Sequence, residues 1–265
     1  MSSRIWTAAI LLVAMGLAST GEASVRSQDV TLEIIDAQGR SFEQFPVRSG
    51  GSALRAYLKA VRGAPYRIRL RNCTGGRVAA VVAVDGRNII SGARSELARG
   101  EPMYVLGPYE TQEYSGWRTS MDDVHEFFFT DWRDSYAEAF GDRSARGVIA
   151  LAVYREQERV ARIPEPRPYS KDEAANAASP APQAAERGAR RAESLAAAPG
   201  TGFGDRRYEP TVRVEFAAER EPSAKVFLKY EWAETLCRKG VIECDSERNR
   251  FWNDDLAFAP FPPRR

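Results

Sequence analysis

The sequence predicts a mainly β protein, an antiparallel, jelly-roll-like β-sandwich. Between Val30 and Glu156, short runs rich in Val, Ile, Tyr and Phe are separated by Gly, Pro, Asp and Asn, which is typical of an all-β domain. The run "YRIRLRN" (66–72) alternates between apolar and polar residues, as a strand with one face in water does. By contrast, "VAAVVAV" (78–84) and "GVIALAVY" (147–154) are almost wholly apolar, which indicates central strands covered on both faces.

The same alternation of apolar runs and turn residues predicts the individual strands of the β domain (24–161). Strands are expected near 30–36, 41–47, 55–61, 65–72, 77–84, 87–91, 103–107, 111–117, 125–130 and 147–155. Asp85 and Gly86 stand between two apolar runs and predict a type I′ hairpin, because both central residues of that turn need a positive φ.

A change in composition marks the end of this domain. Residues 162–200 are rich in Ala, Pro and charge and have hardly a large apolar side chain, so we expect a disordered linker. Beyond it, 201–265 reads as a small α+β segment with strands at 208–219 and 224–230 and a helix at 231–239 that stops at Gly240. A unit this small would be only marginally stable on its own. We therefore expect it to dock on the β domain and cover the second face of the central strands.

The N-terminus predicts export. Arg4 precedes an uncharged run that ends in an A-x-A-like site, so residues 1–23 read as a signal peptide cleaved at about Ala23/Ser24. The mature chain, periplasmic or secreted, has no further run of about 20 apolar residues and thus no predicted transmembrane segment. Its formal net charge of +2 gives no argument for nucleic acid as a partner. Of three cysteines, Cys237 and Cys244 are close enough to pair, the alternative being free thiols, and Cys73 stands apart.

One resemblance rests on a succession of segments. The runs "YRIRLRN", "VAAVVAVDGRNIISG", "YVLGPYETQEYSGWRTS", "FFFTDWRDSYAEAFGDRSARGVIALAVYRE" and "GTGFGDRRYEPTVRVEFAAE" resemble a family of uncharacterised exported bacterial proteins. The resemblance implies a bacterial exported protein with a shared architecture. It transfers no activity and no catalytic residue.

The catalytic inventory is poor. His125 is the only histidine, and no G-x-S-x-G turn accompanies it, so the sequence favours a non-catalytic role. No metal ligand set and no cofactor motif is predicted. A carbohydrate-active hydrolase is the alternative, because acidic residues crowd the segment 122–134 and glycosidases use two carboxylates. Those residues are Asp122, Asp123, Glu126, Asp131 and Asp134.

Two patterns predict binding. Arg67, Arg69 and Arg71 share one face of a strand and could meet an anion; the alternative is a solvated face neutralised by acidic residues of a neighbouring strand. Aromatic and polar residues near turns could form a ligand platform, although large aromatics also fill sandwich cores. The platform residues are Trp117, Arg118, Trp132, Arg133 and Tyr136.

We therefore expect a non-catalytic binding or envelope-structural role, with an envelope protein or a glycan as partner. The remaining alternative is an adhesion or assembly module.

Overall fold

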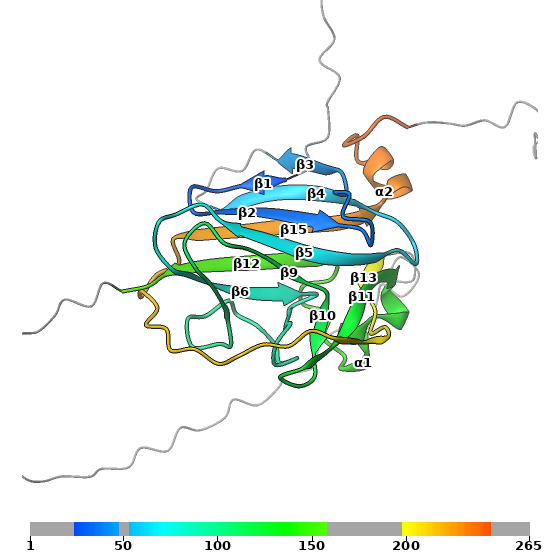
Figure 1. Cartoon of the computed structure of the whole chain (residues 1–265). Helices are drawn as coiled ribbons and strands as arrows, with labels where there is room; N and C mark the ends of the chain where they lie inside the picture. The colour runs from blue at the N-terminus through cyan, green and yellow to red at the C-terminus, as the bar shows by residue number, and fades with distance from the viewer. Residues whose placement is uncertain (1–23, 48–52, 158–197, 245–265) are drawn as a thin grey trace, which may run out of the picture.

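The structure, a computed structural model, describes residues 24–47, 53–157 and 198–244 and confirms a mainly β fold of two facing sheets (Figure 1). The eight-stranded sheet contains β1 (Val25–Arg26), β2 (Val30–Ile35), β5 (Pro65–Asn72), β9 (Thr111–Tyr114), β10 (Gly116–Arg118), β11 (Asp123–Asp131), β13 (Pro199–Thr201) and β14 (Arg206–Tyr208). The seven-stranded sheet contains β3 (Gln44–Val47), β4 (Leu54–Ala60), β6 (Val78–Val84), β7 (Arg87–Asn88), β8 (Tyr104–Leu106), β12 (Val148–Arg155) and β15 (Ala224–Trp232). The helices are η1 (Trp132–Asp134), α1 (Tyr136–Ala139) and α2 (Ala233–Arg238). The expected signal peptide lies outside the described residues.

The core lies between the two sheets. The apolar side of β5 faces it with Tyr66, Ile68 and Leu70, which are buried with Phe127 and Phe129 of β11. Val82 of β6, Leu151 of β12 and Leu228 of β15 meet them from the seven-stranded sheet. The alternation of β5 therefore has the predicted cause, because its arginines lie on the face turned away from the core.

The hairpin at Asp85 and Gly86 is confirmed. Both residues have positive φ, 51° and 83°, and the flanking residues Val84 and Arg87 pair directly across the turn. β7 is shorter than the expected strand at 87–91, because the chain turns again at Gly92 to hydrogen-bond back to Asn88.

Both central strands are buried on both faces, as their apolar sequences predict. The second face has its own small cluster of Val81, Ala152 and Tyr154. Leu97 and Met103, from the chain between β7 and β8, pack on this cluster together with Phe216 and Ala218. The residues after the expected linker thus supply part of the second cover, and a loop of the β domain supplies the rest.

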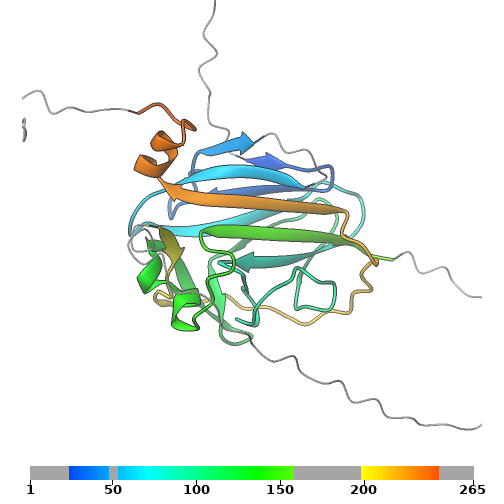
Figure 2. The same cartoon turned by 180° about the vertical axis from the view of Figure 1, so that it is seen from behind.

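The C-terminal segment (198–244) does more than cover the sandwich. β15 lies inside the seven-stranded sheet, antiparallel to β12 and parallel to β4 (Figure 2). The segment was expected to dock on the β domain as a cover; it also adds a strand to the sandwich itself. The pairing of β15 with strands far earlier in the sequence leaves no local sign.

Two expected boundaries also need correction. β13 begins at Pro199, inside the range given to the linker, and pairs with Phe129–Asp131 of β11. The expected strand at 208–219 is mostly wrong, because regular pairing ends with β14 at Tyr208 and only an isolated bridge, Ala218 with Glu156, follows. We call residues 209–218 the strap; its yellow-orange trace runs across the lower part of the molecule in Figure 1.

The predicted disulfide between Cys237 and Cys244 is present and closes the chain around the end of α2. Cys73 is the free cysteine. Within the described ranges, no helix is long and apolar enough to cross a membrane.

Candidate functional site

A pocket of about 360 Å³ opens on the face of the eight-stranded sheet that is turned away from the core. Strands β5, β9 and β11 form its floor and one wall, and the chain around β14 forms the other. Its polar lining residues are Arg67, Glu113, Ser115, Glu126, Arg207, Tyr208 and Glu209. The pocket thus joins two parts of the chain that are far apart in the sequence.

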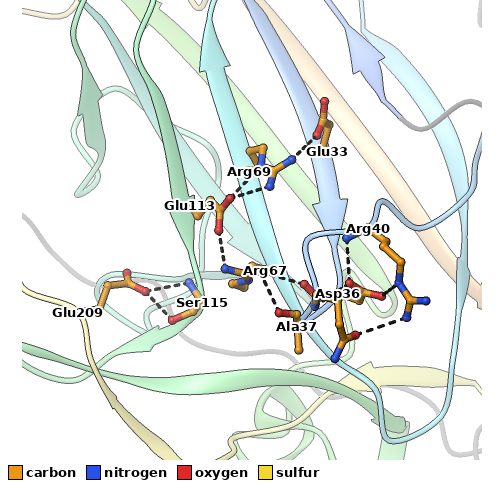
Figure 3. Close-up of polar contacts among 10 residues, drawn as sticks. Glu33, Asp36, Ala37, Arg40, Arg67, Arg69, Glu113, Ser115 and Glu209 are labelled. Atoms are coloured by element: carbon orange, nitrogen blue, oxygen red, sulfur yellow. Dashed lines mark hydrogen bonds and ion pairs between the residues drawn. The ribbon is translucent and has the colours of Figure 1, made fainter.

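The arginine row forms the first wall, and Figure 3 shows how acidic residues neutralise it. Arg67 Nη1 donates to Glu113 Oε2 at 2.6 Å, and Arg69 Nε donates to Glu113 Oε1 at 2.9 Å. Arg69 Nη1 also donates to Glu33 at 3.1 Å; Glu33 lies on β2, directly opposite Arg69 in the strand pair. The hydrogen bond that Arg69 donates to Glu113 is the largest influence on its pKa, which is raised. Two members of the predicted anion row therefore already bind internal carboxylates; Arg71 stays exposed.

The other two nitrogens of the Arg67 guanidinium, Nη2 and Nε, differ in their partners. Its Nη2 donates to the carbonyls of Asp36 at 3.1 Å and Ala37 at 3.4 Å, which fixes the guanidinium against the sheet. Its Nε is buried and has no hydrogen-bond partner among the described residues. A buried donor without a partner is costly. Because this Nε is covered, a ligand in the pocket would contact other atoms of the Arg67 side chain, which is 32% exposed.

The second wall comes from the chain around β14. Glu209 accepts hydrogen bonds from the backbone N–H and the hydroxyl of Ser115 (Figure 3) and from Arg118 Nη2 at 3.0 Å. Arg207 donates to Glu126 at 2.9 Å. Tyr208 lies between Arg207 and Glu209 in the sequence. It is 76% exposed, so its ring is open to solvent at the pocket.

Three anchors hold this wall in place. The backbone N–H of Thr201 donates to the buried carboxylate of Asp85 at 2.8 Å. Trp117 Nε1 donates to the carbonyl of Gly202 at 2.9 Å, and Arg118 Nη1 donates to the carbonyl of Glu209 at 2.9 Å. The pocket therefore depends on contacts between the C-terminal segment and the β domain.

Asp85 is the anchor that the sequence analysis missed. Its carboxylate is fully buried and also accepts hydrogen bonds from the backbone N–H of Gly147 and the hydroxyl of Tyr230, each at 2.6 Å. Burial is the largest influence and raises the pKa of Asp85 to about 6, although these hydrogen bonds act in the opposite direction. The Tyr230 hydroxyl continues through Thr201 to Tyr66, so a chain of hydroxyl groups leads away from the carboxylate.

The predicted aromatic platform is mostly core. Trp117 and Trp132 are each 2% exposed, so neither presents a ring face to a ligand, and the indole N–H of Trp132 donates to Glu138. The Arg118 side chain is 6% exposed, and its guanidinium donates to Glu209 and to neighbouring carbonyls. Tyr136 packs on Trp117, and Arg133 is exposed on η1.

His125 has a structural environment. Its ring stacks on Phe203 with centroids 4.1 Å apart, and its Nδ1 lies 2.8 Å from the carbonyl of Gly204. Phe203 is 42% exposed and also stacks on Tyr136. The only sequence signal for this contact was an aromatic residue between two glycines.

Three carboxylates of the acidic segment 122–134 form ion pairs, and Asp122 and Asp134 are exposed. Asp123 pairs with Arg206, whose hydrogen bonds lower the pKa of Asp123, and Asp131 lies 3.8 Å from Arg62. Glu126, paired with Arg207, is the member of this segment that lines the pocket. A general acid of a glycosidase needs a raised pKa, whereas the hydrogen bonds of Arg206 lower that of Asp123.

Within the described ranges, no group of His, Cys, Asp or Glu side chains is arranged to hold a metal ion. No protein family, curated protein or solved structure matches this chain.

Proposed function

We propose that the protein is an exported, non-catalytic binding protein whose pocket beside Arg67 takes a hydroxyl-rich ligand, a glycan. One observation carries this proposal. The pocket brings the carboxylates of Glu113 and Glu209, the half-buried guanidinium of Arg67 and the exposed ring of Tyr208 to one place on the sheet.

The chemistry of these groups suits sugars. A sugar hydroxyl both donates and accepts, so it can bond to a carboxylate oxygen and to a guanidinium N–H at the same time. A tyrosine ring offers an apolar face with a polar tip, which suits the mixed surface of a pyranose. Because Glu113 is fixed by Arg67 and Arg69, these groups are held in position before a ligand arrives, which lowers the entropy cost of binding.

Pairing also favours binding over the alternative of hydrolysis. The carboxylates that line the pocket are already held in ion pairs: Glu113 with Arg67, Glu126 with Arg207, and Glu209 with Arg118. Hydrolysis needs a carboxyl group that is free to act on the glycosidic bond, whereas each of these carboxylates is already bound by an arginine. A glycan that is bound but not cleaved is the outcome that this arrangement supports.

Export is part of the proposal. The charged residue and uncharged run at the N-terminus support it, and so does the disulfide between Cys237 and Cys244, because disulfides persist in oxidising compartments outside the cytosol.

The test is a glycan array probed with the full chain, followed by titration of any glycan retained. Tyr208→Ala should weaken binding at least tenfold. Tyr109→Ala is the matched control, because Tyr109 is 64% exposed and lies outside the pocket lining. If Tyr208→Ala and Tyr109→Ala bind a retained glycan equally well, or if no glycan is retained, the pocket is not a glycan site.

A further inference from the structure

The strap has the sequence of a strand but is not part of either sheet. Its residues 211–216 read Thr-Val-Arg-Val-Glu-Phe, an alternation typical of a β-strand. Val212 is 78% exposed and Val214 is 56% exposed, which is unusual for β-branched apolar residues so close together.

The hydrogen bonds of the strap follow a period of two. The backbone N–H of Glu209 bonds to Asp122, and that of Thr211 bonds to Met121. Further along, the carbonyl of Glu215 accepts from Arg77, and that of Ala217 accepts from Gln157. Between residues 209 and 217, the residues that bond to the body of the protein in this way are thus odd-numbered, with Arg213 as the odd-numbered residue for which no such bond is found in the described ranges. At the end of the strap, the carbonyl of Ala218 accepts from Gln157 Nε2.

The even-numbered residues in the middle of the strap behave differently. Among the described residues, no hydrogen bond is made by the backbone of Val212, Val214 or Phe216. Backbone N–H and C=O groups of alternate residues point to opposite edges of an extended chain. One edge of the strap therefore faces the body, and the other presents a row of free donors and acceptors. Such an edge is a template for another strand.

The side chains favour one partner, a second copy of the strap. If two straps run antiparallel with Val214 opposite Val214, then Val212 lies opposite Phe216, and Arg213 lies opposite Glu215 of the other copy. Opposite charges directly across an antiparallel pair are favourable, and this register has two such pairs by symmetry. Shifting the register by two residues either way would place Arg213 opposite Arg213, or Glu215 opposite Glu215, which is unfavourable.

We propose that two copies of this chain associate through their straps as an antiparallel strand pair centred on Val214, with Arg213 of each copy against Glu215 of the other. The contact is isologous, so it closes as a two-fold dimer and leaves no edge for further growth. It uses a different surface from the glycan pocket and does not depend on it.

The test is sedimentation velocity of the full chain over a range of concentrations. The native chain should show a concentration-dependent dimer. Arg213→Glu alone and Glu215→Arg alone should each weaken dimerisation at least tenfold, because each puts like charges opposite. The double variant Arg213→Glu/Glu215→Arg should restore the native dissociation constant to within about threefold, because the pairs are re-formed with reversed polarity.

A backbone variant and a control complete the design. Val214→Pro should abolish the dimer, since proline has no N–H to donate, while the monomer keeps its native circular dichroism and melting temperature. Arg71→Glu, at an exposed arginine outside the strap, should leave the dimer unchanged. The proposal is overturned if the chain is monomeric at every concentration, if the double variant is no better than the single ones, or if the dimer survives Val214→Pro.

Discussion

The backbone N–H of Thr201 donates to the carboxylate of Asp85, a residue 116 positions earlier, at a distance of 2.8 Å. Asp85 sits in a hairpin turn of the β domain, and Thr201 lies at the end of β13, the first strand of the C-terminal segment. The contact is buried, so it joins the two parts of the chain where water cannot substitute for either partner.

Asp85→Asn should therefore destabilise the protein. An asparagine has one acceptor oxygen, whereas the two oxygens of Asp85 serve the N–H groups of both Gly147 and Thr201. One buried N–H would lose its partner, at a cost of about 1–3 kcal/mol in the free energy of unfolding. Denaturant titration measures this cost, and Asp122→Asn, at an exposed aspartate, is the control. Equal stability of the two variants would contradict the role given to Asp85.

The stability of the native chain should also depend on pH through Asp85. Its pKa of about 6 lies above its ordinary value of 3.8, so the folded state binds the proton more tightly than the unfolded state does. This contribution is fully present below about pH 4 and is lost as the pH rises through 6; a shift of this size corresponds to about 3 kcal/mol. Tyr66, Tyr230 and Lys229 are the other titratable groups around the carboxyl.

The measurement is the difference in unfolding free energy between the native chain and Asp85→Asn, because other carboxyl groups titrate alike in both. The advantage of the native chain should be larger at pH 4 than at pH 7. A difference that stays constant over this range would show that Asp85 does not titrate there.

Trp117→Ala should act on stability. The indole is buried among Phe127 and Tyr136, and it also holds the carbonyl of Gly202. Its removal should cost about 3–5 kcal/mol, as is usual for large aromatic residues in cores. Thermal and denaturant unfolding measure this loss, with Phe140→Ala, at an exposed ring, as the control. An unchanged melting temperature for Trp117→Ala would be inconsistent with the core position.

Removing the disulfide should have a smaller and local effect. Cys237 and Cys244 are separated by 7 positions, and closing so short a loop contributes about 2–3 kcal/mol by the chain-entropy estimate. The variant Cys237→Ser/Cys244→Ser should lower the melting temperature but keep the β-sheet circular dichroism of the native chain. Collapse of that signal would mean that α2 supports the sandwich more than its packing on β4 and β15 suggests.

Much of the fold could be predicted because strand periodicity is local. The alternation of β5, the apolar runs of β6 and β12, and the Asp85-Gly86 hairpin all follow from neighbouring residues. The position of β15 could not be predicted, because the sequence of a strand does not determine which strands pair with it. The strap shows the converse, since its alternation is that of a strand and yet it forms no ladder with the strands that the structure describes.

The candidate site was harder to predict. The neutralisation of Arg67 and Arg69 by acidic residues on neighbouring strands was among the alternatives, and the structure supplies Glu113 and Glu33. Tyr208 was missed because the pocket needs a wall from beyond residue 198, and its position is set by tertiary contacts alone. Trp117 was ambiguous, because a tryptophan near a turn suits a core and a platform equally well.

The central claim is that the C-terminal segment is an integral part of the sandwich, and native-state hydrogen exchange tests it most directly. β15 lies between β12 and β4, so the amides of Val226, Leu228 and Tyr230 should exchange only through global unfolding. Their free energies of exchange should equal those of the β6 amides to within about 1 kcal/mol. Exchange of the β15 amides through a local opening several kcal/mol easier than that of β6 would contradict the account.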